Sequence, residues 1–306
     1  MTQAAQQRFG KVAVMMGGWS AEREVSLKSG EAVLSGLQAR GIDAQGVDVG
    51  RNICQVLTES KFERVFNILH GTGGEDGAIQ GLMEILNIPF TGSGVAASAL
   101  TMDKLLTKRI WRSAGLPTPA FMRLTAETDW PAVVSALGLP LIVKPVSEGS
   151  SIGMYKIEQE AELKPAWEKA SEYGAVFAEQ WVAGEEYTVA ILKGESLPII
   201  RLETPHQFYD YDAKYAADDT QYFCPCGLSP EQEDSMQKLA LMAFNTLGAS
   251  GWGRVDIMRD AEGKDWLIEV NTVPGMTSHS LVPKAAKAAG IEFDELVERI
   301  LETSFK

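Results

Sequence analysis

The segment I-E-V-N-T-V-P-G-M-T-S-H-S, residues 268–280, starts as an apolar strand and stops at a Pro-Gly pair. Side chains two positions apart in a strand project from the same face of the sheet. We therefore expect Glu269 and Asn271 to point together. Ile268 and Val270 should point the other way. A carboxylate beside a carboxamide places oxygen donors side by side, so the segment predicts either a polar site on a sheet or a solvated face.

The preceding strand carries a matching polar pair. G-R-V-D-I-M (253–258) is joined to W-L-I-E-V-N (266–271) by a polar turn, which predicts a hairpin. Arg254 and Asp256 share one face of the first strand, where Arg254 could neutralise an anion. Either pair alone would more simply be a solvated face, but two pairs on adjacent strands favour a metal site. Mg²⁺ and Mn²⁺ prefer hard oxygen donors, and three are offered: Asp256, Glu269 and Asn271.

A phosphate-binding loop is expected elsewhere, because Mg²⁺ held by few carboxylates usually shares its coordination sphere with phosphates. No G-x-x-x-x-G-K-[ST] motif is present, which excludes a Walker-type loop. Lys144 ends the apolar run L-I-V-K-P (141–145), just before the turn E-G-S-S-I-G (148–153). Backbone N–H groups of such a turn can approach phosphate oxygens, and a lysine adds positive charge. A plain surface turn explains the pattern about equally well.

Three glycine-rich segments nearer the N-terminus are more ambiguous. G-S-G-V-A-A (92–97) matches a dinucleotide fingerprint, but no acidic residue follows at the distance that a ribose contact needs. Glycines at the start of a helix explain it better. G-G-W-S-A-E-R-E (17–24) places Glu22 at a strand end before a helix, either as a ligand contact or as a common capping acid. H-G-T-G-G-E-D-G (70–77) suits a tight turn or a backbone-lined pocket.

The apolar pattern predicts three units along the chain. The first alternates strands with helices, which implies a parallel sheet; the expected segments are strands 11–16, 64–70 and 88–91 and helices 24–40 and 78–86. After a helix-stopping link at 114–120, an α+β unit follows, with strands 141–145, 154–157 and 175–182 and a helix at 159–170.

The last unit is rich in strands. Strands are expected at 187–192 and 197–202, before a polar aromatic loop at 204–227. Ser229 as N-cap, with Gln232 completing a capping box, starts a helix that ends before Gly248.

Composition narrows the class of protein. The chain has 28 basic and 41 acidic residues and a net charge of -13, which disfavours nucleic acid and anionic membrane surfaces as partners. No run of residues is long and apolar enough for a membrane span, and the first residues lack a signal-peptide core. A cytoplasmic location is the expectation. Three cysteines and three scattered histidines indicate a reduced compartment and no zinc site.

Taken together, seven segments resemble one family, the D-alanine–D-alanine ligases of the ATP-grasp superfamily. The segments follow one another along nearly the whole chain: G-G-W-S-A-E-R-E-V-S-L, L-H-G-T-G-G-E-D-G, T-G-S-G-V-A-A-S-A-L-T-M-D-K, V-K-P-V-S-E-G-S-S-I-G, Y-D-Y-D-A-K-Y, G-W-G-R-V-D-I-M and E-V-N-T-V-P-G-M-T-S-H-S-L. Each is a modest signal alone, whereas seven in order are highly specific.

The resemblance implies an α/β fold with a three-domain ATP-grasp architecture. An N-terminal parallel α/β domain (1–103) would carry substrate contacts. A central α+β domain (104–186) and a C-terminal α+β domain (187–306) would clasp ATP. The loop at about 204–227 would be a mobile lid that excludes water from a reactive intermediate.

The resemblance also implies the reaction. ATP would phosphorylate the carboxylate of a first D-alanine, and the amine of a second would attack the acyl phosphate, giving D-alanyl-D-alanine for peptidoglycan. Two Mg²⁺ or Mn²⁺ ions would be held by Asp256, Glu269 and Asn271. The implied ATP contacts are Lys104, Lys144 and Lys214 at the phosphates, and Glu179, Trp181, Val182 and Glu186 at adenine and ribose.

By the same resemblance, Glu22 would accept the ammonium of the first D-alanine, in a hydrogen-bonded set with Ser150 and Tyr215. Arg254 and the N–H of Gly275 would stabilise the tetrahedral oxyanion. The other implied substrate contacts are His70, and Ser280 and Leu281 at the carboxylate of the second D-alanine. A homodimer is implied as well.

Substrate choice leaves alternatives open. Relatives that make D-alanyl-D-lactate or D-alanyl-D-serine tend to lack a tyrosine at the position of Tyr215, so its presence favours an amine as second substrate. The alternatives are another ATP-grasp carboxylate ligase, a nucleotide-binding regulator without catalysis and, last, a nicotinamide dehydrogenase.

Overall fold

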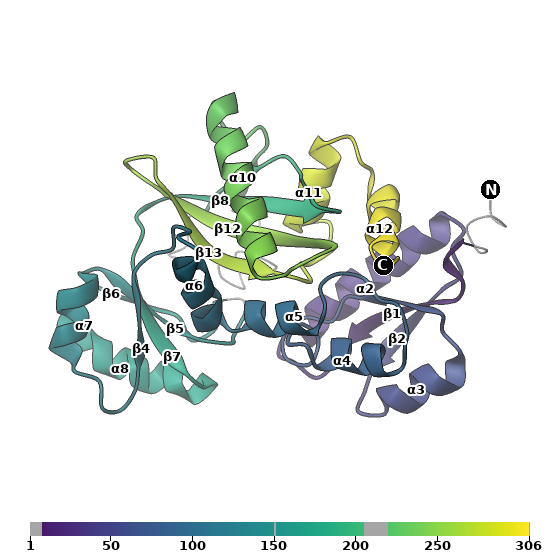
Figure 1. Cartoon of the computed structure of the whole chain (residues 1–306), viewed down its shortest axis with the longest axis horizontal. Coiled ribbons are helices and arrows are strands. Elements are labelled where there is room, and N and C mark those ends of the chain that lie inside the picture. The colour runs from purple at the N-terminus through teal and green to yellow at the C-terminus, as the bar shows by residue number, and fades with distance from the viewer. Residues whose placement is uncertain (1–7, 150, 205–219, 306) are drawn as a thin grey trace.

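The structure of the chain is a computed structural model that describes residues 8–149, 151–204 and 220–305. Its N-terminal sheet is three-stranded and parallel, with strand order β2-β1-β3 (Figure 1). All six residues of β1 are buried, as expected for a strand covered on both faces. The elements of this part are β1 (Val12–Gly17), α2 (Arg23–Ala39), β2 (Ala44–Val49), α3 (Ile53–Ser60), β3 (Arg64–Asn67), α4 (Ala78–Ile85) and α5 (Val95–Met102).

The expected strand at 88–91 is wrong as a strand. Only an isolated bridge forms, between Val65 and Phe90. Pro89 has no N–H to donate to a ladder, and Gly92 turns the chain away at a φ of 84°. The glycines at 92–97 start α5, with Gly94 as its N-cap, as the helix-start interpretation predicted.

The central sheet is antiparallel, with strand order β4-β7-β5-β6. It has an apolar core of its own, which includes Leu141, Val143 and Val176 and residues of the two helices on one face. α6 (Lys104–Ser113) leads into it and ends at the predicted link. The elements are β4 (Phe121–Leu124), α7 (Trp130–Leu137), β5 (Leu141–Pro145), β6 (Tyr155–Ile157), α8 (Glu160–Ala170), the 3₁₀ turn η1 (Ser171–Tyr173) and β7 (Val176–Gln180).

The C-terminal sheet has the order β11-β10-β8-β12-β13, with β9 paired to β8. The predicted capping box is present: Ser229 accepts from the N–H of Gln232, whose side chain accepts from the N–H of Ser229. The elements are β8 (Gly184–Leu192), β9 (Glu195–Ser196), β10 (Ile200–Glu203), β11 (Gln221–Phe223), α10 (Pro230–Thr246), β12 (Trp252–Asp260), β13 (Asp265–Asn271), α11 (Leu281–Ala288) and α12 (Phe293–Glu302).

The N-terminal and C-terminal sheets share one apolar core. α12, at the end of the chain, lies beside α2 (Figure 1). Gly36 of α2 permits this approach, because a Cβ there would come within 2.9 Å of Val297. The shared core joins residues from both ends of the chain, among them Val12, Val33, Leu37, Phe66, Trp252, Met276, Leu296 and Val297.

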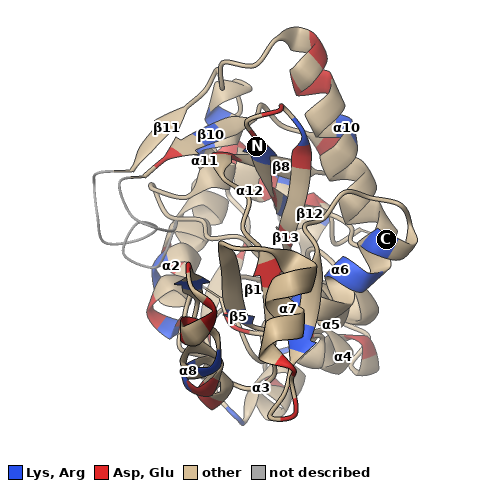
Figure 2. Cartoon of the chain, turned by 90° about the vertical axis from the view of Figure 1, so that its left-hand side faces the viewer, with Lys and Arg blue, Asp and Glu red and all other residues tan. Residues whose placement is uncertain are grey.

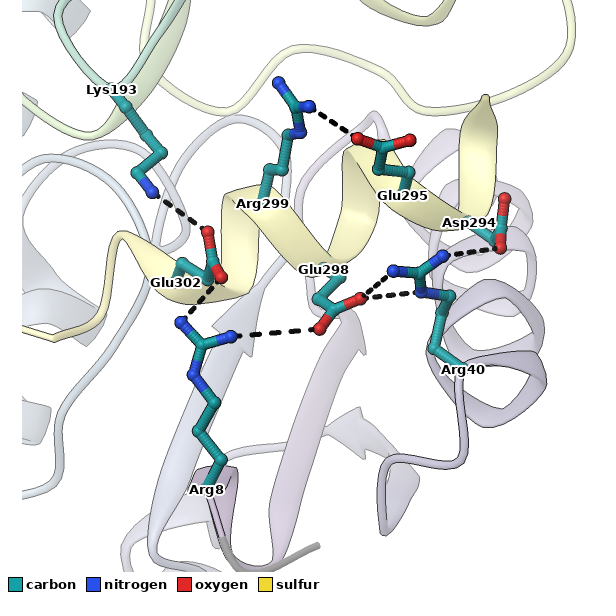
Figure 3. A network of polar contacts seen from close by, with 8 residues as sticks. All are labelled: Arg8, Arg40, Lys193, Asp294, Glu295, Glu298, Arg299 and Glu302. Atoms are coloured by element: carbon teal, nitrogen blue, oxygen red, sulfur yellow. Dashed lines mark hydrogen bonds and ion pairs between the residues drawn. The ribbon is translucent and has the colours of Figure 1, made fainter. Parts of the chain in front are cut away.

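Ion pairs surround this helix contact (Figure 3). Arg40, the C-cap residue of α2, contacts Glu298 at 2.6 Å and Asp294 at 3.4 Å. Glu302 contacts Arg8 at 2.6 Å and Lys193 at 2.9 Å. Exposed pairs of this kind contribute about 0–1 kcal/mol each, so the packing beneath them contributes most of the stabilisation.

The side of the molecule drawn in Figure 2 carries charges of both signs. In the view of Figure 2, acidic and basic residues are interspersed along the elements that face the viewer. No helix in the described part of the chain is both long enough and apolar enough to cross a membrane.

Candidate active site

The β12–β13 hairpin presents the predicted polar pairs on adjacent strands. Arg254 pairs with Asn271, and Asp256 pairs with Glu269. Arg254 donates to both carboxylate oxygens of Asp256, at 2.9 and 2.8 Å. Asn271 Nδ2 donates to the same carboxylate at 3.1 Å, and Thr188 Oγ1 at 2.7 Å. The Asp256 carboxylate therefore has a fixed orientation.

The expected orientation of the Ile268 side chain is wrong. Leu267 and Val270 both belong to the apolar core, whereas Ile268 lines a cavity together with Glu269. The register shifts between Asp256 and Ile257, where a β-bulge interrupts the pairing. A bulge places one extra residue in a strand and breaks the simple alternation of faces, so Ile268 points with Glu269 rather than away from it.

A cavity of about 540 Å³ lies between the central and C-terminal sheets. Its volume is within the range of small-molecule and cofactor sites. Its wall contains six of the seven predicted ATP contacts: Lys104, Lys144, Glu179, Trp181, Val182 and Glu186. Asp256 and Glu269 line it too. Lys214, the seventh predicted contact, lies outside the described residues.

The strand-end lysine of this cavity belongs to a buried ionic group. Lys144 Nζ lies 2.6 Å from Glu179 Oε2, and Lys108 of α6 contacts the other oxygen of the same carboxylate. Burial raises the pKa of Glu179, but the two lysines more than offset this and hold it below its usual value. Burial lowers the pKa of Lys108 against the opposing effect of Glu179. Glu179 thus fixes Lys144 at the cavity wall, and sequence patterns did not indicate Lys108.

A second, smaller cavity brings together residues far apart in the sequence. It is lined by Glu22, His70, Arg254, Asn271 and Gly275, all of them predicted site residues. Glu22 is the N-cap residue of α2, yet its side chain makes no capping hydrogen bond. The Glu22 side chain therefore does not cap α2 through a hydrogen bond.

Two glycines lie close to the Glu22 carboxylate. A Cβ on Gly149 would lie 2.9 Å from Glu22 Oε2, and one on Gly71 would lie 3.0 Å from the same oxygen. The loop after β5 and the loop after β3 therefore both approach this side chain. Glycine at these two positions leaves room for the Glu22 carboxylate where it lies in this structure.

Burial sets the charge state of two groups beside Glu22. Burial lowers the pKa of His70, partly opposed by the negative charge of Glu22 and a backbone hydrogen bond with Val273. Burial, reinforced by Glu22, raises the pKa of Glu75 to about 8. A neutral imidazole and a protonated carboxyl are thus favoured near pH 7. Glu75 was not predicted, although it lies within the H-G-T-G-G-E-D-G segment.

The two cavities meet at a common wall formed by Lys104, Glu148, Gly149 and Glu269. Lys104 Nζ donates to the carbonyl oxygen of Glu148 at 2.6 Å and lies 3.6 Å from Glu269 Oε2. A cation and a carboxylate therefore stand between a cofactor-sized cavity and a small polar one. The arrangement suits transfer of a charged group between two bound molecules.

Some predicted residues lie elsewhere. Ser280 and Leu281 line neither cavity. Ser280 Oγ instead accepts from the N–H of Thr277 at 3.0 Å, and Leu281 is buried in the shared core. Ser150 and Tyr215 lie outside the described residues.

The three predicted metal ligands lie together on the β12–β13 hairpin. Among the described residues, no three His, Cys, Asp or Glu side chains cluster as a metal site. Asp256 and Glu269 are cross-strand neighbours and Asn271 adjoins Asp256. Two carboxylates and one amide fit Mg²⁺ when phosphate oxygens complete the sphere, and both carboxylate residues line the larger cavity.

Solved structures share this architecture. A D-alanine–D-alanine ligase from Bacillus anthracis matches with a TM-score of 0.86 and 35% identity, over 96% of this chain and 97% of that one. The same ligase complexed with ATP matches with a TM-score of 0.84 and 33% identity, over the same shares of both chains. A D-Ala:D-Ser ligase from Enterococcus faecalis matches with a TM-score of 0.82 and 29% identity, over 96% of this chain and 99% of that one. The fold is that of the ATP-grasp enzymes, as the resemblance implied.

Sequence comparison narrows the class further. The D-ala D-ala ligase C-terminus model matches residues 110–302, and the N-terminus model matches residues 51–93. A D-alanine–D-alanine ligase from Methylococcus capsulatus is 62% identical over 97% of both chains. One from Ectopseudomonas mendocina is 60% identical over 97% of this chain and 95% of its own. The chain belongs to the D-alanine–D-alanine ligase family.

Proposed function

We propose that the chain is an ATP-dependent ligase that joins two D-alanines into D-alanyl-D-alanine for peptidoglycan synthesis. The γ-phosphoryl group of ATP passes to the carboxylate of the first D-alanine, and ADP leaves. The amine nitrogen of the second D-alanine then attacks the acyl carbon, phosphate departs with the carboxylate oxygen, and the amine loses a proton. A carboxylate has no adequate leaving group until it is phosphorylated, which explains the need for ATP.

The common wall of the two cavities is the observation that carries this proposal. The larger cavity has the size and the lysines for ATP, and the smaller one has the charged groups for an amino acid. Lys104 and Glu269 stand where the two meet, so the γ-phosphate and a carboxylate acceptor come together there. Phosphoryl transfer depends mainly on such positioning and electrostatic stabilisation.

The predicted site residues that line the smaller cavity have separate roles in this proposal. Glu22 binds the ammonium of the first D-alanine, next to the buried His70. Arg254 and the Gly275 N–H bind the oxyanion that develops when the amine attacks; one such donor contributes about 3 kcal/mol in other enzymes. Ser150 and Tyr215 belong to the Glu22 set. Ser280 and Leu281, which line neither cavity but lie at the start of α11, are kept as the contacts for the carboxylate of the second D-alanine.

In the larger cavity, Lys104, Lys144 and Lys214 bind ATP phosphates, while Glu179 holds Lys144 in place. Glu179, Trp181, Val182 and Glu186 bind adenine and ribose. Asp256, Glu269 and Asn271 hold two Mg²⁺ or Mn²⁺ ions, which neutralise phosphate charge and polarise the transferred group when bound.

The experiment is ADP release by the purified protein with ATP and Mg²⁺, given D-alanine, L-alanine, D-lactate or D-serine, with products identified by mass. We expect turnover with D-alanine alone and a product of D-alanyl-D-alanine. If turnover occurred only when D-serine or D-lactate was added together with D-alanine, the added compound would be the second substrate in place of D-alanine. ATP binding without turnover on any of them would indicate a regulator instead.

Three further parts of the proposal concern the whole protein. We propose the domain division 1–103, 104–186 and 187–306, which limited proteolysis tests. A homodimer is proposed from the family resemblance, and light scattering on the purified protein tests it. A cytoplasmic location fits an enzyme that consumes ATP, and cell fractionation tests it.

A further inference from the structure

The turn Val273–Met276, which contains Gly275, is anchored by residues from the other end of the chain. Glu75 Oε1 accepts the N–H of Val273 at 3.3 Å, and Ser29 Oγ accepts the N–H of Met276 at 3.1 Å. Both anchors belong to the N-terminal part of the chain: Glu75 is 198 residues from Val273 in sequence, and Ser29 is 247 residues from Met276. The turn is therefore positioned from both of its ends.

These contacts leave one backbone donor in the turn. Pro274 has no N–H, and the N–H groups of Val273 and Met276 are engaged by Glu75 and Ser29. Among the residues that the structure describes, none accepts the N–H of Gly275. Gly275 lines the smaller cavity, so the anchors select which N–H is available to a bound molecule.

Ser29 is fully buried in α2 and does not line the cavity itself. Because its oxygen accepts from Met276, its own proton is free for another acceptor. His70 Nε2 lies 3.5 Å from Ser29 Oγ, and His70 lines the cavity. One hydroxyl thus contacts both the turn that holds Gly275 and the ring beside Glu22.

We propose that Ser29 is a positioning residue for the ligase reaction: it holds the Val273–Met276 turn so that the Gly275 N–H meets the developing oxyanion. This inference rests on the proposed function, which assigns Gly275 as an oxyanion donor. Such donors act only when held close to the position of the charge that develops in the transition state. Ser29 also couples that donor to the part of the site that receives the first amino acid.

The same helix provides a matched control. Ser26 is equally buried and lies three residues before Ser29. Its hydroxyl donates to the carbonyl oxygen of Ile68 at 2.8 Å and accepts from the N–H of Gly17 at 2.9 Å. Both of these partners belong to the N-terminal part of the chain, so Ser26→Ala removes a buried hydroxyl without touching the turn.

The experiment compares full-length wild type with Ser29→Ala, Ser29→Thr and Ser26→Ala. Alanine is the best helix former, so Ser29→Ala should fold. Five quantities are measured: kcat, KM for ATP, KM for D-alanine, affinity for a phosphinate dipeptide that mimics the tetrahedral intermediate, and amide hydrogen exchange of residues 272–277. The thermal midpoint of each variant reports stability separately.

For Ser29→Ala we expect kcat and phosphinate affinity to fall together, on the order of tenfold, with KM for ATP unchanged. Exchange of 272–277 should accelerate in this variant and not in Ser26→Ala, while Ser29→Thr should recover much of the loss. Unchanged kcat, phosphinate affinity and exchange in Ser29→Ala would overturn the inference. Equal kinetic losses in Ser26→Ala would also overturn it, because the effect would then be a general loss of packing.

Failure of the proposed function would look different. A wild-type protein that makes no D-alanyl-D-alanine would remove the oxyanion assignment of Gly275, and the inference with it. Exchange of 272–277 would still show whether Ser29 anchors the turn.

Discussion

Asp256 and Glu269 face each other directly across the β12–β13 hairpin, and both line the larger cavity. Asp256 is already held by Arg254, Asn271 and Thr188. Glu269 lies near Lys104 instead, 3.6 Å from its ammonium. Each carboxylate thus has a cation beside it: Arg254 for Asp256 and Lys104 for Glu269.

Glu269→Gln keeps the side-chain shape and removes the charge. We expect Mg²⁺-dependent turnover to fall by about 100-fold or more, because phosphate charge is less well neutralised, while the thermal midpoint stays near that of wild type. Glu262→Gln, on the exposed turn of the same hairpin, is the control and should retain wild-type turnover. Steady-state rates across a Mg²⁺ titration make the comparison; wild-type rates in Glu269→Gln would remove this residue from the site.

Gly149→Ala should impair binding rather than folding. The added Cβ would come within 2.9 Å of the Glu22 carboxylate, the free end of a flexible side chain, which can shift at little energetic expense. We expect KM for D-alanine to rise several-fold with little change in thermal midpoint. Gly81→Ala in α4, where the nearest atom lies 3.9 Å away, should be neutral or stabilising by about 0.5–1 kcal/mol. A D-alanine KM equal to wild type in Gly149→Ala would contradict the close approach.

Glu75 should make stability depend on pH. Its pKa is raised to about 8 in the folded protein, so the folded state binds more protons than the unfolded state between pH 4.5 and 8. Its contribution to stability is therefore fully present below about pH 4.5 and is lost as pH rises toward 8, by at most about 1.4 kcal/mol per pH unit. Glu75→Gln should flatten this decline. Urea unfolding of both proteins without nucleotide, from pH 5 to 8.5, provides the test, and parallel curves would rule out the raised pKa.

The contact between α2 and α12 should depend on packing more than on charge. Leu296 is fully buried in the shared core, so Leu296→Ala should lower the free energy of unfolding by about 2–5 kcal/mol. Glu298→Gln removes the negative charge that pairs with Arg40 and Arg8 and should lower it by less than about 1 kcal/mol. Denaturant unfolding at low and high salt separates the two effects. If Glu298→Gln lowered the free energy of unfolding more than Leu296→Ala does, charge would contribute more than packing to this contact.

Local sequence rules predicted the hairpin of the site well. Period-2 alternation placed Arg254 with Asp256 and Glu269 with Asn271, and the structure pairs them across the strands. The rule failed at Ile268 because of the β-bulge. A bulge depends on how two strands pair, and the sequence of one strand does not show this. The capping box at Ser229 was predicted for the opposite reason: all of its partners lie within four residues.

Contacts between distant segments could not be predicted in this way. Ser29 contacts Met276, and Lys108 contacts Glu179, but nothing in the spacing of either residue indicates its partner. Glu75 could have been found, because it lies in a quoted glycine-rich segment, yet only the fold shows its carboxylate beside Val273 and Gly71. The family resemblance supplied the chemistry of the site, and the three-dimensional structure supplied these supporting contacts.

The packing of α12 against α2 has a consequence for protein synthesis. The first hundred residues leave the ribosome long before Phe293–Glu302 is translated, although that helix covers part of their apolar surface. The nascent N-terminal segment must therefore keep the surface around Gly36 of α2, which Val297 covers, from other apolar partners until translation ends. The central sheet, with its own core, faces no such delay and can fold while the chain is still being made.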